Sequence, residues 1–253
     1  MKVSLISYTQ NALELLLNTK NTRMGGKRAE DMTPEEQAAH LKYMLGTIKS
    51  SWEFIDFIFD VSEVSRACTQ QVERHRHGSF AERTMRALDM SDAEFIMPEH
   101  FKGNADLETT AAVSFKTSVG AYTELVQQGA QLQDARSVLP LNTSTGLMVK
   151  FNLRSLHEMA KVRLCARTQG ETQRLFRAMR EAVIAVYPWA ADFLQVACVA
   201  DGRCAFPNYG KKECKHWDDR MDVDALCDEL KIRFWSDEEM AEANPVAQNG
   251  VSM

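Results

Sequence analysis

Residues 73–86 read ERHRHGSFAERTMR, the densest cluster of cationic side chains in the protein. Six of these fourteen residues are arginine or histidine, and two are acids. Arg74 and Arg76 are two positions apart, so an extended backbone would point both guanidinium groups to one face and His75 to the other. Two planar, permanently charged groups on one face suit a phosphate or a carboxylate. Because Gly78 also lets the backbone approach a ligand closely, the stretch predicts an anion-binding loop.

Composition alone leaves two other interpretations of this stretch open, a solvated basic turn and a patch for nucleic acid. The net charge is −5 and the pI about 5.7, whereas a general nucleic-acid binder is normally basic, so a small anion is the better partner. The residues before the loop favour a fixed position for it. Residues 54–61 read FIDFIFDV, which predicts a buried strand, and residues 61–72 have helical character.

Length and composition are those of a globular enzyme. The chain has 253 residues, of which 45% are hydrophobic and 26% charged, and this suffices for one substantial core or two small ones. No apolar run is long enough to span a bilayer, and the first residues lack the apolar core and cleavage site of a signal peptide. We therefore expect a cytoplasmic protein whose six cysteines are thiols or metal ligands, not disulfides.

Apolar periodicity predicts the remaining elements. Thr33-Pro34-Glu35-Glu36 marks a helix start, because Thr33 can cap the helix, Pro34 suits its first turn and Glu36 completes a capping box. The longest helix should lie in the core or at a subunit interface, with one apolar face formed by Ala112, Phe115, Val119, Tyr122 and Val126. The expected elements are a strand at 2–8, helices at 10–18 and 33–48, a loop at 23–32, a helix at 107–133, a turn and strand-like run at 136–141, a polar loop at 142–146, and helices at 147–165 and 171–186.

The segment 198–217 differs in character from the rest of the chain. Four possible ligands lie there among Gly, Pro and Lys, namely Cys198, Cys204, Cys214 and His216. They could hold zinc tetrahedrally, but their spacing is not a standard zinc pattern, and a loop with reduced thiols is the simpler account. We therefore predict no metal site.

The chain has no repeats and no clear linker, so one α+β domain over residues 1–235 is the simplest organisation. Residues 236–253 are acidic, then small and polar, and we expect a flexible tail there. Cys68 and Cys165 lie in apolar helical contexts and are expected in the core.

Several motifs, in the same order along the chain, resemble the flavin-dependent thymidylate synthases. Arg74-His75-Arg76, followed by seven residues and then Thr84, is similar to that family's Arg-His-Arg, seven residues, Ser. The other matching blocks are Ser50-Ser51-Trp52-Glu53, residues 64–73 (VSRACTQQVE), residues 135–142 (ARSVLPLN), Asn152-Leu153-Arg154-Ser155-Leu156, Val162-Arg163 with Gln169 and Glu171 following, and Tyr187-Pro188-Trp189. Together they span about residues 46–194, and several ordered blocks are a specific signal where one alone is weak.

The resemblance implies a central, mostly antiparallel sheet flanked by helices, in a homotetramer whose active sites lie between subunits. It implies reductive methylation of dUMP to dTMP, with FAD as the cofactor and NADPH and methylenetetrahydrofolate as co-substrates. The expected partners are therefore a pyrimidine nucleoside monophosphate and a folate, with neither nucleic acid nor membrane. A nucleoside monophosphate is a dianion and FAD carries a pyrophosphate, which accounts for clustered arginines.

The resemblance also assigns residues to ligands. Arg163 would act in catalysis at the uracil edge by stabilising charge on the ring, together with the hydroxyl of Thr84. The flavin side would be formed by Ser50, Glu53, Arg74, His75, Arg76, Asn152, Arg154 and Glu158. The nucleotide would be bound by Gln71, Glu82, Thr84, Arg86, Arg136 and Arg163.

Departures from the family pattern lie around the expected pocket. Thr84 keeps the hydroxyl of the motif serine on a side chain that is stiffer at χ1. The other departures are Ala81 in place of Asn, Ala87 in place of Tyr, Ile48 and Phe54 in place of His, Ile58 in place of Thr, and Glu158 in place of Asn or His.

They leave two alternatives open. In the first, the chain is a hydroxymethylase of dUMP or dCMP, in which water instead of hydride captures the exocyclic methylene intermediate. In the second, it is a catalytically silent flavin- or nucleotide-binding homologue, against which four arginines argue together: Arg74, Arg76, Arg136 and Arg163.

Overall fold

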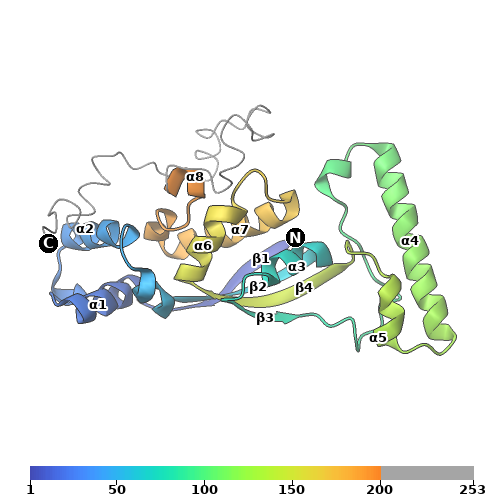
Figure 1. The fold of residues 1–253 in the computed structure, drawn as a ribbon, viewed down its shortest axis with the longest axis horizontal. Coiled ribbons are helices and arrows are strands. Elements are labelled where there is room, and N and C mark those ends of the chain that lie inside the picture. The colour runs from blue at the N-terminus through green and yellow to red at the C-terminus, as the bar shows by residue number, and fades with distance from the viewer. Residues whose placement is uncertain (201–253) are drawn as a thin grey trace, which may run out of the picture.

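The computed structural model describes residues 1–200, and these are built on one four-stranded sheet (Figure 1). Its strand order is β1-β2-β4-β3, and every neighbouring pair is antiparallel. The strands are β1 (Lys2–Tyr8), β2 (Asp56–Ser65), β3 (Ser79–Glu82) and β4 (Ser144–Asn152). The expected α+β fold, with a mostly antiparallel sheet and flanking helices, is confirmed.

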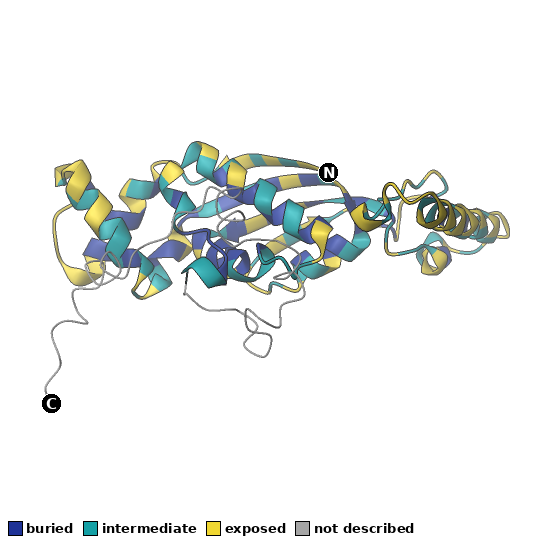
Figure 2. Ribbon diagram, turned by 90° about the horizontal axis from the view of Figure 1, so that it is seen from above, coloured by how far each residue is buried: buried dark blue, intermediate teal, exposed yellow. Residues whose placement is uncertain are grey.

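The sheet buries one face and exposes the other. On the central strand β4, Leu147, Val149 and Phe151 are buried, whereas Met148 and Lys150 between them are exposed. This alternation follows from the period of two residues in a strand. The buried face packs under α3 (Arg66–Glu73), α6 (Leu153–Arg163) and α7 (Gly170–Val186), as Figures 1 and 2 show.

The N-terminal helices extend the body at one end. They are α1 (Ala12–Met24) and α2 (Pro34–Leu45), with the short 3-10 helices η1 (Ala29–Asp31) and η2 (Lys49–Phe54) after each of them. The capping box expected at the start of α2 is present, because Glu36 N donates to Thr33 Oγ1 at 3.2 Å and Thr33 N donates to Glu36 Oε2 at 2.9 Å. The C-terminal end of the described chain adds η5 (Pro188–Ala191) and α8 (Ala197–Ala200).

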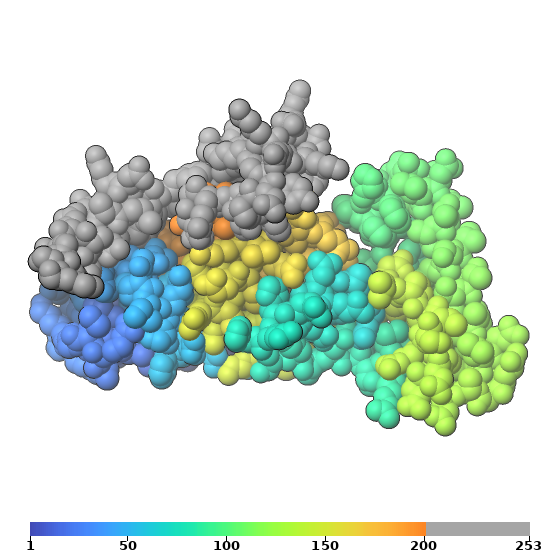
Figure 3. All heavy atoms as spheres, viewed as in Figure 1, coloured from blue at the N-terminus to red at the C-terminus, as the bar shows by residue number. Residues whose placement is uncertain are grey.

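Residues 83–143, between β3 and β4, form an arm that projects from the other end of the body (Figures 1 and 3). The arm contains η3 (Glu99–Phe101), α4 (Ala105–Gln127), α5 (Leu132–Ala135) and η4 (Arg136–Val138). It has a small core of its own, formed by Met85, Met90, Tyr122 and Ala135. On the predicted apolar face of the long helix, Phe115 and Tyr122 are buried, and Ala112, Val119 and Val126 are half-buried. The helix does not lie in the core, since Figure 2 shows α4 largely exposed, so its position at a subunit interface stays a prediction.

Two predicted helices began too early, and one predicted loop extended too far, where the central strands run. Residues 61–65 were expected to be helical, but β2 continues to Ser65 and pairs it with Ser144 on β4. Residues 142–146 were expected to be a polar loop, but β4 begins at Ser144. Residues 147–152 were expected to begin a helix, but apolar residues alternate there with period two, and the helical spacing starts only at Leu153.

The other expected elements agree with the structure or differ in their bounds. The strand at 2–8 and the helix at 171–186 are confirmed, whereas α1 runs to Met24 instead of ending at residue 18, and residues 136–141 hold a 3-10 turn and no strand. Cys68 is buried as predicted, whereas Cys165, also expected in the core, is only partly buried against it. Cys204, Cys214, His216 and the expected tail at 236–253 lie outside the described residues. In the part of the chain that is described, none of the helices combines the length and apolarity that crossing a membrane requires.

Candidate active site

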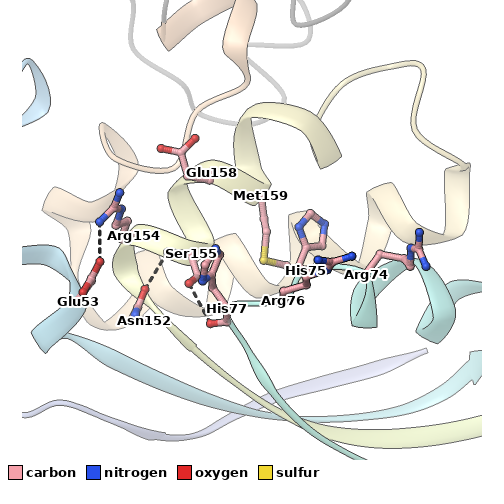
Figure 4. A pocket seen from close by; sticks show the side chains of 10 residues that line it. All are labelled: Glu53, Arg74, His75, Arg76, His77, Asn152, Arg154, Ser155, Glu158 and Met159. Carbon is pink, nitrogen blue, oxygen red and sulfur yellow. Dashed lines mark hydrogen bonds and ion pairs between the residues drawn. The ribbon is translucent and has the colours of Figure 1, made fainter. Parts of the chain in front are cut away.

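The largest cluster of predicted site residues surrounds a pocket of about 610 Å³. Its lining comes from η2, from the turn after α3 and from the start of α6 (Figure 4). η2 and α6 meet because Asp56 at the start of β2 pairs with Asn152 at the end of β4. The turn joins them at the same end of the sheet, because it leads into β3, whose Ser79 pairs with Lys150 of β4. The lining residues are Glu53, Arg74, His75, Arg76, His77, Asn152, Arg154, Ser155, Glu158 and Met159.

On one side of the pocket, hydrogen bonds and an ion pair connect the start of α6 to η2 and to the turn after α3. Arg154 Nη1 lies 2.6 Å from Glu53 Oε1, and both side chains are about half exposed. Asn152 caps α6, because its Oδ1 accepts a hydrogen bond from Ser155 N at 2.8 Å. Ser155 Oγ in turn donates to His77 O at 3.1 Å. The start of α6 therefore fixes both Arg154 and the turn opposite it.

The opposite side is the turn from Arg74 to Gly78, and the expectation of an extended backbone there was wrong. Arg74 is helical, with φ −66° and ψ −14°, because α3 ends on it and the chain then turns into β3. Within residues 1–200, neither Arg74 nor Arg76 forms an ion pair, so both guanidinium groups remain available to an anion. A Cβ at Gly78 would collide with the ring of Phe151 and lie 2.7 Å from Phe80 Cζ, so the turn needs glycine at this point.

His75 lines the pocket and is held from behind by Arg163. Arg163 Nε donates to His75 Nε2 at 2.9 Å, and Arg163 Nη2 donates to Gln71 O at 3.1 Å. Burial first, and then the Arg163 charge, lower the pKa of His75 to about 4. The imidazole is therefore neutral at pH 7, and since Nε2 accepts, Nδ1 carries the proton. Burial also lowers the pKa of Arg163.

Glu82, a predicted nucleotide ligand, is already engaged within the chain. Its carboxylate accepts a hydrogen bond from Thr69 Oγ1 at 2.6 Å and lies 2.6 Å from Arg66 Nη1. Burial and the neighbouring Glu82 raise the pKa of Glu73. Arg66 and Thr69 were not predicted, although both lie in the block before the Arg-His-Arg motif, where their spacing from Glu82 carries no signal in the sequence.

The other predicted nucleotide residues belong to two separate groups. Gln71 hydrogen bonds to Gln169 at the end of α3. Arg86 and Arg136 meet in the arm, where Arg86 Nε donates to Gln133 Oε1 and Arg136 Nε to Gln133 O, each at 3.1 Å. Thr84 is beside them, since its Oγ1 accepts from Arg86 N at 3.1 Å. None of these four predicted residues lines the pocket.

Ser50 is the one predicted flavin residue that does not line the pocket, and its Oγ accepts from Arg23 Nη1 at 3.1 Å. Three lining residues were missed: His77, Ser155 and Met159. The pattern Asn152-x-x-Ser155 at the start of α6 is typical of a helix N-cap and offered a signal for Ser155. The predicted roles of all these residues toward a ligand remain predictions.

Fold and site together define an α+β protein with an arginine-lined pocket whose charge suits an anionic ligand. Two guanidinium groups without acidic partners suit a phosphate or pyrophosphate, and about 610 Å³ lies in the usual range for cofactor and ligand pockets. The residues present therefore fit a phosphate-bearing cofactor such as FAD.

Comparison with known proteins confirms the resemblance drawn from the motifs. The family model for the thymidylate synthase complementing protein matches residues 4–189, so the chain belongs to that family. A flavin-dependent thymidylate synthase of Pyrococcus furiosus is 28% identical over 238 residues, which cover 86% of this chain and 97% of the relative. Proteins of the same description from Saccharolobus solfataricus (27% over 209 residues, 79% and 78%) and Nitratidesulfovibrio vulgaris (28% over 221 residues, 80% and 90%) are also similar.

Proposed function

We propose that the chain is a flavin-dependent thymidylate synthase, which converts dUMP to dTMP with FAD, NADPH and methylenetetrahydrofolate. The observation that carries this proposal is the pair of unpartnered guanidinium groups, Arg74 and Arg76, across a pocket from Arg154 and Glu53, in a chain of this family. Bound FAD would supply hydride transfer from NADPH to the one-carbon unit that folate delivers.

The flavin side of the proposal assigns a role to each group around the pocket. Arg74 and Arg76 would neutralise the pyrophosphate, since neither must first leave an internal partner. Arg154 would add a third cation, oriented by Glu53. The proton on His75 Nδ1 would be the hydrogen-bond donor toward the flavin, because Arg163 occupies Nε2. Ser50, Asn152 and Glu158 would complete the surroundings of the cofactor.

The nucleotide side of the proposal centres on Arg163. Its guanidinium is half-buried, which strengthens its interaction with charge that develops on the pyrimidine ring. The hydroxyl of Thr84 would act with it in catalysis. Binding of the monophosphate would use Gln71, Thr84, Arg86 and Arg136 directly. Glu82 would contribute through Arg66 and Thr69, to which its carboxylate is already bound.

A homotetramer with active sites between subunits would unite these groups. Support comes from the position of Arg86 and Arg136, which meet at Gln133 in the arm and do not line the pocket of their own chain. The arm of a neighbouring copy would bring both guanidinium groups to that pocket. The location that we propose for the assembled enzyme is the cytoplasm.

The hydroxymethylase alternative is favoured by one specific observation. Ile48, which precedes η2, and Phe54, which ends it, expose 70% and 59% of their surface, and the family often has histidine at both positions. With Ile and Phe at these two positions, neither side chain can donate or accept a proton near the ligand, as histidine could. The choice between methylation and hydroxymethylation therefore needs a product measurement.

The test is mass spectrometry of the nucleotide product after incubation with FAD, NADPH and methylenetetrahydrofolate, with dUMP and dCMP supplied separately. A methyl group on dUMP supports the proposal. A hydroxymethyl group, or reaction of dCMP alone, supports the alternative. Absence of product with either nucleotide, despite bound flavin, refutes both and leaves the silent homologue.

Two sets of variants sharpen this test. Arg74→Gln with Arg76→Gln should abolish flavin binding, whereas Arg28→Gln, an exposed arginine that does not line the pocket, should not. Mixed oligomers of Arg76→Gln and Arg136→Gln subunits should regain activity if each site draws on two chains. No regain would refute the shared site.

A further inference from the structure

The carboxylate of Glu171 lies in the junction between α3 and α7, outside the pocket. Glu171 is 9% exposed and sits in the first turn of α7. It accepts two hydrogen bonds from one residue, from Ser65 N at 2.7 Å and from Ser65 Oγ at 2.5 Å. A buried carboxylate is costly unless hydrogen bonds compensate it, so this geometry indicates a defined task.

Ser65 connects the sheet to α3. It is the last residue of β2, paired with Ser144, and it is also the N-cap of α3, because its Oγ accepts from Cys68 N at 3.1 Å. Glu171 therefore holds the point at which the strand becomes the helix.

The helix that starts there needs external support. α3 has eight residues, and isolated helices of this length are not stable in water. Its far end is held by Arg163, which donates to Gln71 O and to His75 Nε2. The helix is thus fastened to α7 at its start and to α6 at its end.

We infer that Glu171 is a positioning residue: by fixing the N-terminus of α3, its carboxylate sets the contact between Arg163 and His75 behind the pocket. What this contact does for a ligand rests on the proposed function, but the positioning itself does not. No ligand contact of Glu171 is involved, and it acts through Ser65 and α3.

Two substitutions separate the hydrogen bonds from the charge. In Glu171→Gln the amide oxygen still accepts from Ser65 N, and the amide nitrogen donates to Ser65 Oγ, which keeps a lone pair for Cys68 N. Glu171→Ala removes both bonds and leaves a buried N–H without an acceptor. Glu181 is exposed on the same helix, so Glu181→Ala is the matched control.

The readout is the ring titration of His75 in the whole chain, followed by NMR with ¹³C-labelled histidine and assigned with His75→Gln. In the parent protein His75 stays neutral down to a pKa of about 4. In Glu171→Ala we expect that pKa to rise by at least one unit, roughly a tenfold gain in proton affinity, because the ring loses Arg163 and gains water. Glu171→Gln should restore the parent value, and Glu181→Ala should not change it.

Loss of global stability alone would leave the His75 titration of the folded protein unchanged, so an unmoved pKa in Glu171→Ala overturns the inference. If that variant does not fold, Ser65→Ala replaces it, since it removes the cap and one of the two bonds. In Ser65→Ala we expect a smaller rise in the pKa of His75, and the absence of any rise would overturn the inference. The titration needs no ligand, so an inactive parent protein would refute the proposed function without bearing on Glu171.

Discussion

His157 should make the folded protein sensitive to acid. The side chain is 4% exposed and lies at the centre of the α6 packing face, with its ring edge-on to Trp52 at a centroid distance of 4.9 Å. Its Nδ1 donates to Phe193 O at 2.6 Å, and within residues 1–200 its buried Nε2 has no hydrogen-bond partner. A proton added at Nε2 would therefore be a buried charge with only weak compensation, because Glu158 Oε1 lies 3.9 Å away on a side chain that is exposed to water.

The sign and size of the effect follow from proton linkage. Burial, helped by the charges of Lys49 and Lys161, lowers the pKa of His157 from 6.5 to about 4. Between these two pKa values the unfolded chain binds a proton that the folded chain does not bind. The contribution of His157 to the free energy of unfolding is therefore fully present above pH 7 and falls as the pH drops through 6.5 towards 4. The loss from this residue is about 2 kcal/mol at about pH 5 and about 3 kcal/mol at about pH 4.

The measurement is urea unfolding of the parent protein and His157→Asn at several pH values between about 7.5 and 4.5. Asn retains an N–H near the position of Nδ1 for Phe193 O but does not titrate. The variant will be less stable at neutral pH because it leaves a cavity, but its free energy of unfolding should fall about 2 kcal/mol less than that of the parent down to about pH 5. Other groups, including His75, titrate equally in both proteins.

His100→Asn is the matched control, because His100 is exposed on η3. It should leave the pH dependence as in the parent. If His157→Asn and the parent lose the same free energy of unfolding between neutral pH and about pH 5, the description of His157 as a buried neutral imidazole is refuted.

Three further predictions concern the turn, the arm and the pocket. Gly78→Ala should cost about 1–3 kcal/mol, since its Cβ would collide with the rings of Phe80 and Phe151; an unchanged thermal midpoint would contradict the tight approach. Tyr122→Phe should cost about 1–3 kcal/mol, since the tyrosine hydroxyl accepts from Met90 N at 3.1 Å in the small core of the arm. Hydrogen exchange at the Met90 amide should accelerate in this variant, and an unchanged exchange rate would contradict the hydrogen bond. Glu53→Gln should change the free energy of unfolding by less than about 1 kcal/mol, since the ion pair with Arg154 is half-exposed, while flavin affinity falls in a fluorescence titration; a larger stability loss with unchanged affinity would make the pair structural.

Local signals in the sequence predicted local structure well. The capping box at Thr33 and Glu36 depends on residues three apart, and it is present as expected. The inward face of α4, with Phe115 and Tyr122 buried, also follows from spacing alone. Such features need no knowledge of the rest of the chain, and therefore one sequence suffices to find them.

Errors arose where two periods meet in one run of apolar residues. Leu147, Val149 and Phe151 alternate as in a strand, and Leu153 and Leu156 continue at helical spacing with no loop between them. Within a window that covers both, the helical period dominates, and the strand is lost. The boundary at Asn152 is fixed by the pairing of β4 with β2, which reaches this residue, and by its role as the N-cap of α6.

The site itself shows a similar limit, because the motifs identified charged groups but not their partners. Glu53 and Arg154 are 101 residues apart in the sequence. They meet only because the start of β2 and the end of β4 are paired at the same end of the sheet. Glu82, in the same motif region as the arginines, already has two partners.

These pairings rank the predicted ligand residues by how many internal contacts each must break before it can bind a ligand. Arg74 and Arg76 have no acidic partner in the described chain, so an anion can bind them without displacing anything. Glu82 would have to leave Arg66 and Thr69, both largely shielded from water, before it could contact a nucleotide. Because breaking such a pair leaves a shielded charge uncompensated, Glu82 is better suited to hold Arg66 and the start of α3 in place than to bind a ligand directly. Binding of the anionic ligand should therefore depend far more strongly on the two arginines than on this carboxylate.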